Sequence, residues 1–163
     1  MMQEKLGMGI TYTLRYTPPG GDEEQVITCN LMPSEGLNYI LNAAILGGSQ
    51  TDQFFLGLID GTIVPGAGSD MAAVAGVEFT GYDDNFRPLW VAAQSSLSCT
   101  NDASPAQYAL NADTDIKGIF LSTDTSQGDD GLLLSLATIL PPLTVVAGST
   151  LNVVASFAFT SSV

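Results

Sequence analysis

Apolar and polar residues alternate with a period of two along much of the chain, a pattern typical of β-strands with one buried face. Residues 10–16 alternate over seven positions, and residues 24–30 form a second strand-like run. Between them, the sequence PPGGD at residues 18–22 predicts a turn, because two fixed φ angles followed by two free ones suit no regular element. The pattern predicts an N-terminal β-hairpin with an exposed, acidic tip.

One segment follows a helical period instead. Apolar residues recur there at steps of three and four, at Leu37, Ile40, Leu41, Ala44 and Ile45. Pro33 and Ser34 precede this run and a pair of glycines follows it, as at the two ends of a helix. We expect one short amphipathic helix over residues 34–46, with its apolar stripe packed against a sheet.

The rest of the chain returns to short strands. Further apolar or alternating runs lie at residues 54–59, 89–91, 108–110, 116–121, 132–136 and 151–159. With the hairpin, these runs predict an all-β fold, an antiparallel β-sandwich or jelly roll of eight or nine strands. We divide the chain into an N-terminal hairpin or arm, residues 1–30, and a β-sandwich domain, residues 31–163.

The charge of the chain narrows the choice of partners. It carries 4 Lys and Arg against 17 Asp and Glu, a formal net charge of −13. Four scattered cations cannot form the basic surface that neutralises phosphates, which argues against nucleic-acid binding, and attachment to anionic lipid is disfavoured for the same reason. No apolar run reaches the roughly 18 residues of a membrane span. We expect neither a nucleic acid nor a membrane as a partner.

The chain has no histidine, which removes most of the side-chain sets used for catalysis and metal binding. Ser-His-Asp and Cys-His catalysis need one, and so do His-containing zinc or iron sites. With 17 acids, close pairs such as Asp83 and Asp84 occur by chance and do not indicate a catalytic pair. We expect no enzymatic activity and no cofactor. For Cys29 and Cys99, free reduced thiols are the favoured interpretation and a single disulfide is the alternative.

Two acidic loops are candidates for calcium binding. Residues 113–115 and 124–131 place carboxylates near each other, and glycines accompany those of the second loop. Neither loop has the closing glutamate of an EF-hand, so solvated turns between strands are the favoured interpretation. A carbohydrate-binding module with a calcium-stiffened loop stays open as an alternative from a different functional class.

Arg87 is the third candidate, in a segment rich in acids and aromatic residues. One guanidinium in an acidic chain finds a carboxylate, and Asp83, Asp84 and Glu78 are the nearest in sequence. A two-pronged bond to one of them would lock the turn before a strand. We predict a structural ion pair here.

The strand at residues 10–16 has an apolar and aromatic stripe on one face, made of Ile10, Tyr12, Leu14 and Tyr16. Such a stripe suits a partner surface. It equally suits the cover of a sandwich core, which is the usual role of an amphipathic strand. In the first interpretation, the hairpin at residues 1–30 is the arm that attaches the protein to its partner.

An ordered set of short motifs runs from about residue 30 to the C-terminus. The motifs are NLMPSEGLNYIL (30–41), FLGLIDG (55–61), SDMA (69–72), AGVE (75–78), RPLW (87–90), KGIFL (117–121) and AGSTLNV (147–153). In this order they resemble a widespread set of tailed-bacteriophage virion proteins, which are labelled capsid decoration (cement), head-fibre or tail-fibre-like proteins.

The resemblance implies a structural protein of the virion, assembled in the host cytoplasm. The expected partner is the major capsid protein, and the expected assembly is a homotrimer that bridges neighbouring capsid subunits on the outer face of the shell. A strongly acidic protein is repelled by the packaged genome, which also favours the outer face, and a reducing cytosol suits free cysteines. A tail or fibre component that contacts host receptors is the alternative within the same class.

Overall fold

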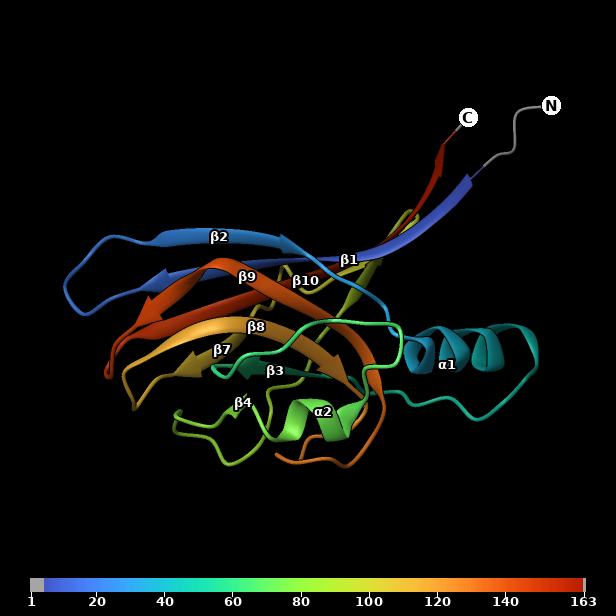
Figure 1. Cartoon of the computed structure of the whole chain (residues 1–163). Coiled ribbons are helices and arrows are strands. Elements are labelled where there is room, and N and C mark those ends of the chain that lie inside the picture. The colour runs from blue at the N-terminus through green and yellow to red at the C-terminus, as the bar shows by residue number, and fades with distance from the viewer. Residues whose placement is uncertain (1–4, 163) are drawn as a thin grey trace.

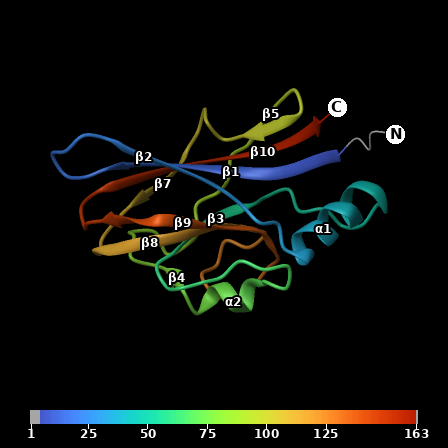
Figure 2. The ribbon, with the colours of Figure 1, turned by 45° about the horizontal axis from the view of Figure 1, so that its top comes forward.

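The structure of the chain is a computed structural model that describes the backbone of residues 5–162 and the side chains of residues 8–159. Two antiparallel sheets lie face to face (Figures 1 and 2). The predicted β-sandwich is therefore confirmed. The structure has ten strands where eight or nine were expected, because three strands of only two or three residues add to the longer ones.

The larger sheet has six strands. Its order is β2 (Glu24–Cys29), β1 (Lys5–Thr17), β10 (Thr150–Ser162), β6 (Ser98–Thr100) and β5 (Ala93–Ser95), with β7 (Ala106–Ala109) also paired to β10. The smaller sheet has four strands, in the order β4 (Glu78–Phe79), β3 (Phe55–Ile59), β8 (Thr114–Ser122) and β9 (Leu133–Val145). The expected strand at residues 89–91 is reduced to a single bridge between Leu89 and Phe55.

Two helices complete the fold. The predicted helix is confirmed as α1 (Ser34–Ile45), which leads from β2 towards β3 and lies at one end of the sandwich (Figure 1). The second helix, α2 (Met71–Ala75), begins after Asp70, whose carboxylate accepts a hydrogen bond from the Ala73 N–H at 2.9 Å. Met71 and Val74 of α2 are buried in a small cluster with Phe120 of β8, so α2 covers the outer face of the smaller sheet.

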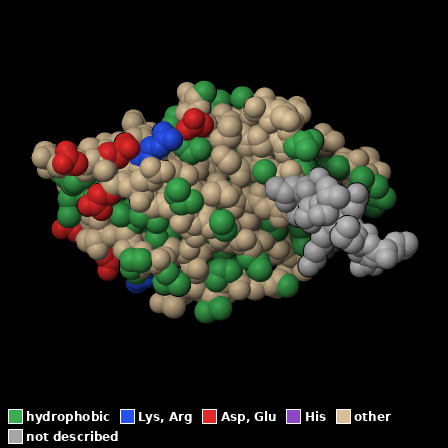
Figure 3. Space-filling view, turned by 90° about the horizontal axis from the view of Figure 1, so that it is seen from above, with side chains coloured by type: hydrophobic (Ala, Val, Ile, Leu, Met, Phe, Trp, Pro, Cys, Tyr) green, Lys and Arg blue, Asp and Glu red, His purple; other side chains and the backbone are tan. Residues whose placement is uncertain are grey.

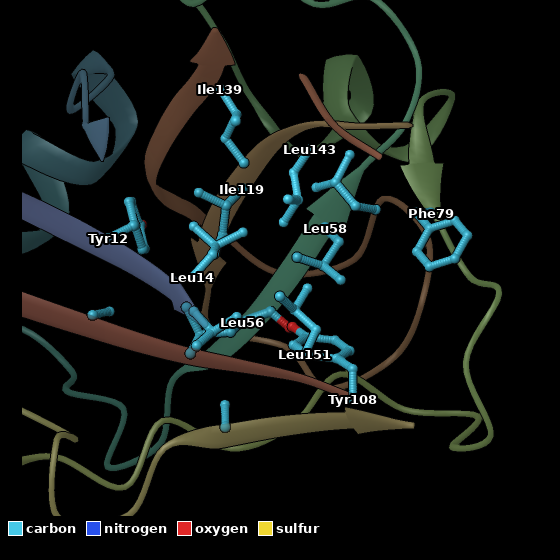
Figure 4. Close-up of a cluster of buried hydrophobic side chains, with 14 of the residues drawn as sticks. Tyr12, Leu14, Leu56, Leu58, Phe79, Tyr108, Ile119, Ile139, Leu143 and Leu151 are labelled. Atoms are coloured by element: carbon cyan, nitrogen blue, oxygen red, sulfur yellow. The ribbon is translucent and has the colours of Figure 1, made fainter. Parts of the chain in front are cut away.

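The main core lies between the two sheets (Figure 4). Ile10, Tyr12, Leu14 and Tyr16 are all buried in it, with at most 4% of each residue exposed. The interpretation of this stripe as a partner surface is therefore wrong. The physical reason is the position of β1, which lies between β2 and β10 and turns its apolar face towards the smaller sheet.

The predicted boundary at residue 30 is also incorrect, since the first hairpin is part of the sandwich. β1 pairs with β10 along its whole length, from Lys5 opposite Ser162 to Thr17 opposite Thr150. After β2, the chain stays bound to the smaller sheet, because Leu31 and Leu136 exchange backbone hydrogen bonds of 2.9 and 3.0 Å. The N-terminal segment thus supplies central strands of the fold and forms no separate arm.

The first turn of α1 is attached to β9. The Leu133 N–H donates to a carboxylate oxygen of Glu35 at 2.9 Å. Gly36 lies so close to β9 that a Cβ at this position would be 2.3 Å from the carbonyl oxygen of Leu134. Glycine is therefore required at this contact, which fixes the position of α1 relative to the smaller sheet.

Candidate interaction surface

Arg87 forms the ion pair that the sequence predicts, and its partner is Glu78. Two guanidinium nitrogens, Nε and Nη2, donate to the two carboxylate oxygens of Glu78 at 2.7 and 2.9 Å. Further hydrogen bonds reach the carbonyl oxygens of Asp124 and Gly128, at 3.0 and 2.7 Å. Arg87 therefore holds the loop between β8 and β9 to the smaller sheet, and its role is structural.

Asp83 and Asp84, the other two predicted partners of Arg87, are both exposed. Asp83 accepts a hydrogen bond from the Asn111 side chain at 3.3 Å. Neither carboxylate forms an ion pair with Arg87, because the bonds of Arg87 run to Glu78 and to backbone oxygens.

The acidic loops do not converge on a common point. Asp113 accepts from the Ala147 N–H at 2.7 Å, Asp115 from the Thr144 hydroxyl at 2.6 Å and Asp124 from the Ser126 N–H at 2.7 Å. Asp124 thus closes its own turn, Asp115 bonds across the β8–β9 pair, and Asp113 bonds the loop between β9 and β10. Within residues 5–162, no group of three or more His, Cys, Asp or Glu side chains is placed to hold a metal ion.

The most strongly perturbed titratable groups are tyrosines of the core. Burial raises the pKa of Tyr12 well above its usual range, and a hydrogen bond with Ser135 opposes this shift only in part. Burial also raises the pKa of Tyr108, whose hydroxyl donates to the carbonyl oxygen of Leu56 at 2.8 Å. Both side chains are packed between the sheets and away from any cleft, so these shifts are consequences of burial rather than signs of a catalytic site.

Charge is distributed unevenly over the face of the molecule that Figure 3 shows. Acidic side chains gather at one end of this face, where the turn between β1 and β2 carries Asp22 and Glu23 and β2 begins with Glu24. Arg15 lies near this end and pairs with Asp102 at 2.9 Å. The other end contains α1, the β5–β6 hairpin and the last part of β10 (Figures 1 and 2). Residues 36–51, 88–101 and 153–162, which form much of this end, include no Asp, Glu, Lys or Arg.

We call these three segments the charge-free end. An apolar groove of about 350 Å³ opens beside them, lined by Tyr39, Ile40, Asp52, Phe54, Trp90, Ala92, Cys99, Leu134, Phe157 and Phe159. Asp52, which follows the first segment, is the one charged residue of this lining. Its aromatic rings stack edge to face, with centroids 6.0 Å apart for Tyr39 and Phe54 and 6.1 Å apart for Phe54 and Trp90. The indole N–H of Trp90 donates to the Ala155 carbonyl at 3.0 Å, which fixes this wall of the groove.

The outer side of α1 adds a second apolar surface to the charge-free end. Leu41, Ile45 and the following Leu46 are 57%, 73% and 77% exposed. The sequence predicted that this stripe would cover a sheet, yet in the structure only Ile40 of the stripe packs against the main core. Gly36 and Tyr39 face the body of the protein from the other side of the helix, so the outer stripe has no partner among the described residues.

The two cysteines do not pair. Cys29 is exposed on β2, and Cys99 is half-buried at the wall of the groove. Both are free thiols in the structure, as the sequence favoured.

Sequence reasoning missed the charge-free end as a surface. The groove joins residues from α1, β6, β9, β10 and the loops before β3 and β5, and no local pattern connects these segments. One signal was present, because residues 131–163 contain no charged side chain, which is unusual in so acidic a chain.

No helix in the described part of the chain is long and apolar enough to cross a membrane. No protein-family model, no curated protein and no solved structure matches this chain.

Proposed function

We propose that this chain is a non-enzymatic structural protein of a tailed-phage virion, a decoration or cement protein that binds the outer face of the capsid shell. The proposal rests on the ordered motifs between residues 30 and 153, which resemble virion proteins of this kind. Its partner is the major capsid protein, and its task is to bridge neighbouring capsid subunits against the internal pressure of the packaged genome.

The observation that carries the proposal is the separation of charge from apolar surface. A protein that binds the outside of a shell needs one face that loses its water when it is buried against the partner. It also needs another face that stays in contact with solvent. The charge-free end supplies the first, since apolar surface is the main source of association free energy. The acidic end supplies the second, and its charge keeps it away from a genome of the same sign.

Within the charge-free end, the outer stripe of α1 is the part best suited to enter the shell. A single helix with an exposed apolar stripe fits a groove between two protein subunits. Ile45 is 73% exposed and no charged residue lies within the helix after Glu35, so its burial removes apolar surface from water without desolvating a charge. In this proposal, the outer stripe contacts the capsid protein, and the position of α1 determines which way the stripe faces.

Reconstitution tests the proposal directly. Phage shells assembled without this protein are mixed with the purified full chain, sedimented, and analysed for the number of chains bound per shell. We expect saturable binding at a fixed stoichiometry. Ile45→Asp is expected to weaken this binding at least tenfold, whereas Ile27→Asp, which adds the same charge at a residue 62% exposed on β2, binds like the wild type.

The tail or fibre alternative predicts a different location for the protein. In virions separated into heads and tails, a decoration protein is found with the heads. Recovery only with the tails, together with no binding to shells, would refute the decoration role and favour the fibre role.

A further inference from the structure

The β1–β10 ribbon extends further than its neighbours in the larger sheet. β1 pairs with β2 only from Thr11 onwards, where Thr11 lies opposite Cys29. Residues 5–9 of β1 therefore have β10 on one side and, among the described residues, no strand on the other. Figures 1 and 2 show this part of the ribbon continuing past the end of β2. It is a free sheet edge.

The hydrogen bonds of Ile10 show which backbone groups point to this edge. The Ile10 N–H donates to the Asn30 side-chain oxygen at 2.8 Å, and the Ile10 carbonyl accepts from the Asn30 N–H at 3.1 Å. Backbone groups of an antiparallel strand alternate between its two sides, so those of Met8 point to the same side as those of Ile10. The N–H and carbonyl of Met8 therefore face the free edge, ready to pair with another strand.

A hollow beside this edge contains an unused donor. The hollow has a volume of about 310 Å³ and is lined by Met8, Gly9, Ile10, Thr11, Cys29, Asn30 and Ala158. The side-chain nitrogen of Asn30 is buried and has no hydrogen-bond partner among the described residues. A buried polar atom without a partner is costly, and a backbone carbonyl of an added strand would accept this hydrogen bond.

We propose that the strand added at this edge comes from a second copy of this chain. The argument is electrostatic. Each copy carries a net charge of −13, so two copies can approach closely only where their surfaces lack charge. Residues 6–14 and 25–34, which flank the edge and the hollow, contain no charged side chain. Within residues 5–9, Lys5 is the one charged residue, and its positive charge does not repel a second, strongly acidic copy. The inference concerns contacts between copies and does not depend on attachment to a shell.

Substitution of Met8 tests the edge without disturbing the sheet. Met8→Pro removes a backbone N–H that points away from β10, so it leaves the β1–β10 hydrogen bonds intact while blocking the added strand. Met8→Ala is the matched control, since it shortens the same side chain and keeps the N–H. The mass of the full-length chain in solution, 17.0 kDa for one copy, is measured by light scattering from 1 µM upwards for each variant.

We expect the wild type and Met8→Ala to self-associate, and Met8→Pro to associate at least tenfold more weakly with an unchanged circular dichroism spectrum. Asn30→Asp is a second variant. It keeps the oxygen that accepts from the Ile10 N–H, but it removes the side-chain N–H donor of Asn30 and adds a negative charge. We expect it to weaken association as well. A thiol assay gives an independent readout, because Cys29 at the hollow should react more slowly as association proceeds while Cys99 should not change.

A wild-type chain that stays monomeric at 200 µM would overturn the proposal. Self-association that survives both Met8→Pro and Asn30→Asp would overturn the choice of surface. If Met8→Pro does not fold, the association of Asn30→Asp and the reactivity of Cys29 show whether the copies pair through this edge or through another surface. Monomers that still bind shells would refute only this inference, whereas an associating chain that binds no shell would refute only the decoration role.

Discussion

Arg87 and Glu78 form a two-pronged ion pair that is almost completely removed from solvent, with 0% and 2% of the side chains exposed. The guanidinium carbon also lies 5.1 Å from the centre of the Phe120 ring, in a cation–π arrangement. The pair joins β4 to the loop after β8, because the same guanidinium binds the carbonyl oxygens of that loop. One side chain thus links β4, the loop after β8 and the buried Phe120 of β8.

Arg87→Ala is expected to lower the free energy of unfolding by about 3–5 kcal/mol, because it leaves the Glu78 carboxylate buried and unpaired. Arg87→Lys should recover only part of this loss, since an ammonium group cannot bond both carboxylate oxygens in a planar fork. Urea denaturation of the purified variants measures both values.

Two controls accompany this measurement. Asp83→Asn and Asp84→Asn should leave stability within about 0.5 kcal/mol of the wild type, because neither exposed carboxylate pairs with Arg87. The double variant Arg87→Met with Glu78→Leu should be more stable than Arg87→Ala, since it removes both buried charges. An Arg87→Ala protein as stable as the wild type would show that the ion pair contributes nothing.

Gly36→Ala is expected to destabilise the protein, against the usual trend in helices. Alanine normally stabilises a helix interior relative to glycine, by about 1 kcal/mol. At Gly36 the new methyl group would collide with the backbone of Leu134, and overpacking of this kind costs about 1–3 kcal/mol.

The matched controls for this glycine are Gly66→Ala and Gly68→Ala, where an added Cβ meets nothing within 4 Å. Thermal unfolding should show a lower melting temperature for Gly36→Ala alone. Equal melting temperatures for all three variants would mean that α1 is not held against β9 as the structure describes.

The protein should lose stability in alkali. Burial raises the pKa of Tyr12 and Tyr108 in the folded state above the value of about 10 that tyrosine has in an unfolded chain. A group with a raised pKa stabilises the folded state fully below its unfolded pKa, and this contribution falls as the pH rises beyond it. Above about pH 10, each of these tyrosines should lower the free energy of unfolding by about 1.4 kcal/mol per pH unit.

Unfolding measured between pH 9 and 12 tests this dependence. Tyr108→Phe should show a shallower decline than the wild type, because phenylalanine cannot ionise. Ionisation of Tyr12 and Tyr108 near pH 10 in a protein that remains folded would contradict the burial of these hydroxyls.

Both thiols should be free in the purified protein. Ellman's reagent is expected to titrate two thiols per chain, with Cys29 reacting faster than Cys99 because Cys29 is exposed and Cys99 is half-buried. A mass spectrum that shows the loss of two hydrogens without added oxidant would indicate a disulfide and contradict the structure.

Much of the fold could be predicted from local pattern. The period of two in residues 10–16 identifies a strand, and the period near 3.6 in residues 37–45 identifies α1 within one residue of its end. The strand signal exists because β1 buries one face, whereas the helical signal exists although most of its apolar stripe is exposed. The pairing of Arg87 with an acid nearby in sequence was predictable for a similar reason, since an arginine in so acidic a chain meets a carboxylate wherever it folds.

What pattern could not give was the place of each element in the sandwich. The alternating sequence from Ile10 to Tyr16 is the same whether its apolar face covers a core or binds a partner. The position of β1 between β2 and β10 is what turns that face towards the core. The helix presents the reverse case. Its stripe was expected to be buried, yet contact through Gly36 turns Leu41 and Ile45 outward. In both cases a long-range contact overrides what an amphipathic pattern suggests.

A cryo-EM map of the phage head at subnanometre resolution tests the central claim most directly. We expect density for this β-sandwich on the outer face of the shell, with α1 and the groove of Trp90 directed at the capsid protein and the turn of Asp22 to Glu24 directed at solvent. A head without such density, or one in which the acidic turn faces the shell, would contradict the account.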